Sequence, residues 1–104
     1  MDLESTVMEI IINSGQARSF AYEALGKAKE GDFDGAETLM NESAEAAKQA
    51  HKVQTQLIEQ DQGTGKTPMT LVMVHAQDHL MTSMLAQEMV TELITLHRRL
   101  AQRG

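Results

Sequence analysis

Two histidines and an aspartate lie within five residues of one another in the last third of the chain. On a helix His75, Asp78, His79 and Thr82 would share an arc of roughly 100°, because residues three and four apart are neighbours. Leucine and methionine residues fall on the same side, so this arc is expected to belong to the core face. Burying two imidazoles and a carboxylate there would be costly without a purpose. Residues 75–82 are therefore the candidate functional site.

Three kinds of chemistry fit this cluster. Imidazole and carboxylate groups at helical spacing could bind a metal ion, although they supply only three ligands. Alternatively, one imidazole could be a nucleophile that takes up a phosphoryl group while the second histidine orients or neutralises it. A purely structural role is also open, in which a polar layer fixes helix register or oligomeric state.

Two helix-breaking segments divide the chain into three parts that must position this cluster. Gly31 suits a left-handed helix end, and Asp32 or Asp34 could cap the helix that follows. Residues 61–68 contain two glycines and the only proline, which predicts a loop, and Thr67 with Pro68 could begin the third helix.

The first two segments carry small and apolar residues at alternating spacings of three and four, the pattern of a helix buried along one side. These residues are Ile10, Ser14, Ala17, Ala21, Ala24 and Ala28 in the first segment, and Ala36, Leu39, Ser43, Ala46, Ala50, Val53 and Leu57 in the second. No stretch alternates with the period of a strand. The predicted fold is all-α: an up-down-up antiparallel three-helix bundle that forms one domain over residues 1–104.

The third segment has more apolar surface than one bundle can bury. One half of its circumference, expected to be the core face, carries Leu85, Ala86, Met89, Val90, Leu93, Ile94, Leu96 and Leu100. A second stripe on the opposite side carries Met73, Ala76, Leu80 and Met84. This methionine-rich stripe is expected either to dock a partner or to pack against other copies of the chain.

Composition excludes several other functions. The 104 residues have a net charge of −6, which opposes binding to nucleic acid, and the absence of cysteine excludes disulfides, thiolate metal sites and a cysteine nucleophile. The apolar run at the N-terminus is only three residues long, too short for a signal peptide or a membrane span. We expect a soluble cytoplasmic protein that is not inserted into the membrane.

Three blocks of sequence resemble a known family. They are IINSGQARS at residues 11–19, GDF at 31–33 and VHAQDHLMT at 74–82. Together they are similar to the IIA component of the lactose/cellobiose/chitobiose class of the bacterial phosphoenolpyruvate-dependent sugar phosphotransferase system. The residues of the first and third blocks resemble the N,N′-diacetylchitobiose/cellobiose branch more closely than the lactose branch.

The resemblance implies a phosphocarrier with a covalent phosphohistidine intermediate. Such a chain would form a homotrimer through its third helix, accept a phosphoryl group from the phosphocarrier HPr and pass it to the cognate IIB component. The transported sugar would be a β-linked disaccharide that this chain never touches. The runner-up hypothesis is a non-catalytic oligomeric scaffold or adaptor that binds metal.

The resemblance also assigns roles to four residues. His75 would carry the phosphoryl group, His79 would be its neighbour at the active site, and Gln77 would reach the site of an adjacent subunit. Asp78 would lie at the trimer axis, where three copies meet and hold a divalent cation such as Mg²⁺. Helical geometry agrees with two of these roles, because Gln77 projects away from His75, and three converging carboxylates would need protonation or a shared cation.

Overall fold

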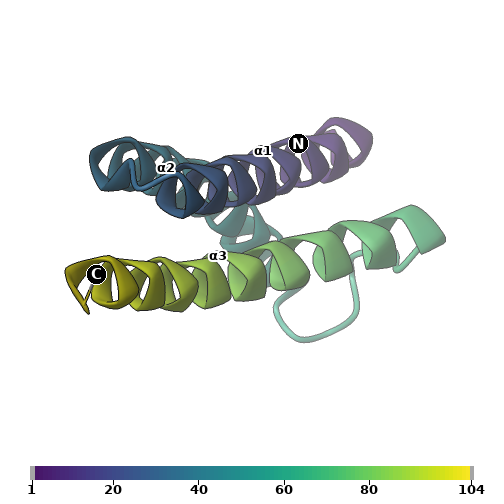
Figure 1. Ribbon diagram of the computed structural model, residues 1–104. Helices are drawn as coiled ribbons and strands as arrows, with labels where there is room; N and C mark the ends of the chain where they lie inside the picture. Colours follow the sequence, from purple (N-terminus) through teal and green to yellow (C-terminus); the bar gives the residue numbers. More distant parts are fainter. Residues whose placement is uncertain (1, 104) are drawn as a thin grey trace.

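The computed structural model describes residues 2–103, which form an elongated bundle of three helices measuring 56 × 20 × 20 Å. The helices are α1 (Leu3–Lys29), α2 (Phe33–Asp61) and α3 (Leu71–Arg103). They run up, down and up, so that α1 and α3 point the same way (Figure 1). The predicted all-α three-helix architecture is confirmed. Helix α1 packs extensively against both other helices, while α2 and α3 touch each other less.

Both helix breaks lie where the sequence predicts them. Gly31 has a φ of 85°, and Asp32 caps α2 by accepting a hydrogen bond of 2.9 Å from the Gly35 amide. Helix α2 ends at Gln62, which adopts the left-handed conformation with a φ of 54°. The Thr67 amide donates to Asp61 at 2.8 Å, and this hydrogen bond lowers the pKa of the Asp61 carboxyl.

The third helix begins later than predicted. It starts at Leu71 rather than at Thr67 and Pro68, and the hydroxyl of Thr70 accepts a hydrogen bond from the Met73 amide at 3.3 Å. The loop between α2 and α3 therefore covers residues 62–70.

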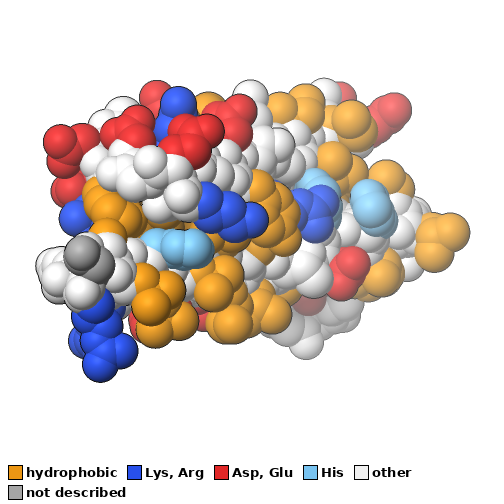
Figure 2. All heavy atoms as spheres, in the orientation of Figure 1, with side chains coloured by type: hydrophobic (Ala, Val, Ile, Leu, Met, Phe, Trp, Pro, Cys, Tyr) orange, Lys and Arg blue, Asp and Glu red, His pale blue; other side chains and the backbone are white. Residues whose placement is uncertain are grey.

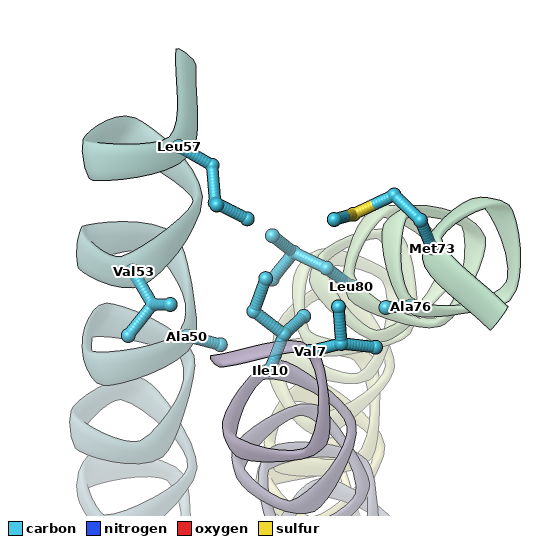
Figure 3. Close-up of a cluster of buried hydrophobic side chains, with 8 residues drawn as sticks. All are labelled: Val7, Ile10, Ala50, Val53, Leu57, Met73, Ala76 and Leu80. Atoms are coloured by element: carbon cyan, nitrogen blue, oxygen red, sulfur yellow. The ribbon is translucent and has the colours of Figure 1, made fainter. Parts of the chain in front are cut away.

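The core divides into a cluster of large side chains at one end and a region of small ones further along. The first cluster brings together residues of all three helices (Figure 3): Val7, Ile10, Ala50, Val53, Leu57, Met73, Ala76 and Leu80. Further along, alanines of α1 and α2 let the two backbones approach closely, and the Ser43 hydroxyl donates to the Ala17 carbonyl at 2.6 Å. The predicted seams of α1 and α2 are confirmed, apart from the half-buried Leu39.

The predicted orientation of α3 is wrong over most of its length. Met73, Ala76 and Leu80 lie in the core, together with Ser83, Val90 and Ile94. Of the face expected to be buried, Val90 and Ile94 do lie in the core, but Leu85, Met89, Leu93, Leu96 and Leu100 are exposed, with Leu85 57% and Met89 55% accessible. We call this surface the outer face of α3; its exposed apolar side chains are Leu71, Val74, Met81, Leu85, Met89, Leu93, Leu96 and Leu100.

The outer face is a row of apolar side chains that the bundle leaves uncovered. Figure 2 shows hydrophobic side chains gathered along α3, with histidine side chains beside them. Within residues 2–103, no helix is long and apolar enough to cross a membrane.

Candidate functional site

The imidazole rings of His75 and His79 stack on each other one helical turn apart. Their centroids are 5.7 Å apart and their planes are inclined by 18° (ring stacking). His75 is exposed, whereas His79 is partly buried against α1. The structure therefore brings the two predicted active-site histidines together and leaves His75 open to a partner.

Two residues of α1, one turn apart, surround the His79 ring. The Arg18 guanidinium lies 3.3 Å from the His79 Nδ1 atom. On the other edge of the ring, a Cβ atom built on Gly15 would lie 3.5 Å from Nε2, an ordinary van der Waals contact, so Gly15 lies directly against this edge of the imidazole.

The surroundings of His79 favour its neutral form. Partial burial lowers the pKa of His79, the positive charge of Arg18 and the neighbouring His75 lower it further, and the negative charge of Asp78 acts in the opposite direction. A His79 that is neutral near pH 7 keeps the nitrogen next to Arg18 free to accept a hydrogen bond.

Asp78 and Thr82 were expected on the core face of α3, but the structure places both outside the core. Both are exposed, and Asp78 sits in the outer face of α3, while the Thr82 hydroxyl donates to the Asp78 carbonyl at 2.9 Å. No group of three histidine, aspartate or glutamate side chains within residues 2–103 is arranged to hold a metal ion. A metal site formed by His75, Asp78 and His79 of one chain is therefore not present in the described structure.

Gln77 lies on the other side of α3 from the histidine pair. It is half-buried, and its Oε1 atom accepts a hydrogen bond of 2.6 Å from the Nε2 atom of Gln54 in α2. Gln77 also lines a mostly apolar cavity of about 330 Å³ between the end of α2, the 62–70 loop and the start of α3. Within one chain, Gln77 is therefore held away from His75.

Sequence reasoning missed the contributions of three residues to these sites. In the sequence, Gly15 and Arg18 stand out only as members of the block at residues 11–19 that resembles the family. No sequence pattern points to Gln54. Arg18 and His79 are 61 positions apart in the chain, and only the packing of α1 on α3 brings them together.

Comparison with known proteins identifies the family. Residues 5–98 match the family described as "PTS system, Lactose/Cellobiose specific IIA subunit". The chain belongs to this family. It is thus a component of the sugar phosphotransferase system, as the three sequence blocks predict.

The relatives of this IIA component include proteins of the chitobiose and cellobiose branch. It is 62% identical to the N,N′-diacetylchitobiose-specific EIIA component of Escherichia coli over 95% of this chain and 85% of that protein. It is 43% identical to the lichenan-specific IIA component of Bacillus subtilis, over 99% and 94% of the two chains.

Solved structures of similar proteins have the same fold. The cellobiose-specific enzyme IIA of Bacillus anthracis superposes with a TM-score of 0.95 at 39% identity, over 100% of this chain and 95% of that one. The chitobiose IIA protein of Escherichia coli, solved in complex with HPr, has a TM-score of 0.85 at 59% identity, over 97% and 98% of the two chains.

Proposed function

We propose that this IIA component accepts a phosphoryl group from HPr on His75 and passes it to a IIB component, in the uptake of a β-linked disaccharide of the chitobiose or cellobiose kind. The observation that carries the proposal is the exposed His75 ring, stacked on a partly buried His79 that is itself held by Arg18. The relatives specific for chitobiose, and the relative solved with HPr, support the choice of sugar class and donor.

The chemistry requires little more than a positioned imidazole. A neutral imidazole nitrogen of His75 attacks the phosphorus carried by HPr, and a nitrogen–phosphorus bond forms as the bond to the donor histidine breaks. Since the stacked His79 restricts the His75 ring, much of the rate enhancement would come from orientation of the attacking nitrogen. The same steps in reverse order, with IIB as acceptor, return His75 to its free state.

The outer face of α3 supports a trimer built on this helix. Leu71, Val74, Asp78, Met81 and Leu85 follow one another at spacings of three and four, which is the seam of a coiled coil. Four of these five positions are exposed apolar side chains, from 48% to 88% accessible. Packing three copies of α3 together would remove this surface from water.

The same arrangement explains how Gln77 could serve a neighbouring site. His75 and Gln77 flank the seam on opposite sides, because they precede Asp78 by three residues and one residue on a helix that advances about 100° per residue. In a ring with threefold symmetry, the His75 side of one subunit meets the Gln77 side of the next. The Gln54 amide occupies Gln77 Oε1, and the Gln77 Nε2 atom donates one N–H to the Met73 sulfur at 3.7 Å, so its second N–H is the group that can donate to a phosphoryl oxygen.

Asp78 is the one charged residue in this part of the seam. It has no carboxylate or imidazole neighbours in its own chain that would complete a metal site in the described region, but three copies at a trimer axis would bring three carboxylates together. Oxygen ligands of this kind suit Mg²⁺, which would neutralise their charge. The residues present therefore fit a shared divalent cation between subunits.

Asp78→Leu should remove the need for that cation. We expect the wild-type trimer to weaken in chelator near neutral pH, because clustered buried carboxylates without a cation cost ~3–5 kcal/mol. Asp78→Leu should remain trimeric with or without chelator, since an apolar replacement of a buried ionic group is often neutral or stabilising. Sedimentation of both proteins checks this. A chelator-resistant wild type beside a monomeric Asp78→Leu would rule out the axial cation.

Mass spectrometry tests the proposed function directly. Incubation with phosphoenolpyruvate, enzyme I and HPr should add one acid-labile phosphoryl group to each chain, and subsequent addition of a chitobiose-type IIB component should remove it. A chain that gains no mass while staying oligomeric would instead support the non-catalytic scaffold.

A further inference from the structure

The Arg18–His79 contact determines which nitrogen of His79 carries the proton. A guanidinium has only donor groups, so the His79 Nδ1 atom 3.3 Å from the Arg18 Nη2 atom must be the acceptor. The proton of the neutral ring therefore lies on Nε2, the atom that faces Gly15. One arginine thus selects both the tautomer and the rotation of this imidazole.

Among the described residues, Arg18 has no second polar partner that would explain its position. Within residues 2–103 the one side-chain ion pair joins Arg98 and Glu37 at 3.8 Å, and the polar side-chain contact of Arg18 is the one to His79. In a chain with a net charge of −6, a half-buried arginine that contacts an imidazole rather than a carboxylate points to a role at that imidazole.

We propose that Arg18 is a positioning residue of the phosphoryl-transfer site, which acts on His75 through His79. The guanidinium fixes one edge of the His79 ring, the backbone at Gly15 bounds the other edge, and the face of the ring stacks on His75. His79 is then a rigid surface that restricts rotation of His75. This inference rests on the proposed function, because it takes His75 as the residue that receives the phosphoryl group.

A positioning role and a docking role predict different kinetics. Loss of orientation lowers the rate within the complex and leaves the affinity for the donor unchanged, whereas loss of a surface cation that contacts HPr raises KM. Arg18→Ala should therefore lower kcat for phosphoryl transfer from phospho-HPr about tenfold or more, with KM changed less than about threefold. Arg18→Lys, which keeps a cationic donor, should recover part of the loss.

Arg98→Ala is the matched control. Arg98 is also half-buried and lies about 28 Å from His79 along α3, so its loss removes one positive charge without touching the histidine pair. It should leave both kcat and KM close to their wild-type values. Guanidinium ion added to Arg18→Ala should raise kcat more than added ammonium does, because only guanidinium reproduces the planar arrangement of donors.

Nitrogen NMR of the unphosphorylated protein provides a readout that needs no phosphoryl transfer. At a pH where the imidazoles are neutral, wild-type His79 should show an unprotonated Nδ1, and Arg18→Ala should show both tautomers. A protonated Nδ1 in the wild type, an unchanged kcat in Arg18→Ala, or a rise in KM alone would each overturn the proposal. If the nitrogen spectrum is as expected but the wild type is not phosphorylated, the proposed function is wrong. Arg18 would then hold His79 in one tautomer, and the positioning role in phosphoryl transfer would be overturned with the function.

Discussion

His75→Ala is expected to abolish phosphoryl acceptance while the proposed trimer and the helical content remain. The variant lacks the nitrogen that forms the phosphorus bond, and loss of a nucleophile lowers rates by a factor on the order of 10⁴ or more. Because His75 is exposed, its removal leaves no cavity in the core of the bundle. Phosphoryl uptake is measured by mass spectrometry, and assembly by circular dichroism and sedimentation.

His51→Ala is the control for the loss of an exposed histidine. His51 lies on α2, is exposed and is not part of the histidine pair on α3, so this variant should take up phosphate normally. If His75→Ala is phosphorylated and His79→Ala is not, then His79 is the nucleophile and the proposed roles must be exchanged.

Mixed trimers can extend this experiment to the contact between subunits. Gln77→Ala alone should weaken transfer without abolishing it, because an orienting donor contributes less than the nucleophile. When Gln77→Ala and His75→Ala chains are combined, some intact His75 sites will lie beside an intact Gln77 of the neighbouring chain. Activity per intact His75 should then rise above that of Gln77→Ala alone, and no rise would mean that Gln77 does not act across the interface.

Leu85→Asp should separate the subunits. Leu85 is 57% accessible in one chain and lies in the seam of the outer face, so the single chain should fold normally with a polar residue there. In a trimer, each new carboxylate would be buried without a partner at a cost of ~3–5 kcal/mol. We expect a folded monomer whose phosphoryl transfer is strongly reduced, since each site would lose Gln77 of its neighbour.

Tyr22→Asp is the comparison for Leu85→Asp. Tyr22 is 56% accessible but lies on α1, away from the outer face of α3. This variant should stay trimeric in sedimentation experiments. Dissociation of both variants would indicate general destabilisation, and a trimeric Leu85→Asp would show that the outer face is not the contact between subunits.

The helices themselves could be predicted because their signals are local. A left-handed glycine with a capping aspartate ends one helix and begins the next at residues 31 and 32, and small residues at helical spacing identify the inner sides of α1 and α2. The stacking of His75 on His79 is equally local, since residues four apart meet on any helix. The residue types in that turn then limited the chemistry to a few possibilities.

The rotation of α3 could not be predicted from its own sequence. Both of its sides are apolar, so periodicity alone does not show which one faces α1, and the stripe with Ala76 and Leu80 is buried because it fits against Ile10. The partners of the site residues depend on the same packing: Arg18 and His79 are 61 positions apart, and Gln54 and Gln77 are 23 apart. Sequence alone thus determined the helices and the histidine pair, whereas tertiary packing decided which side of α3 is exposed and which side chains hold His79 and Gln77, because these depend on contacts between distant segments.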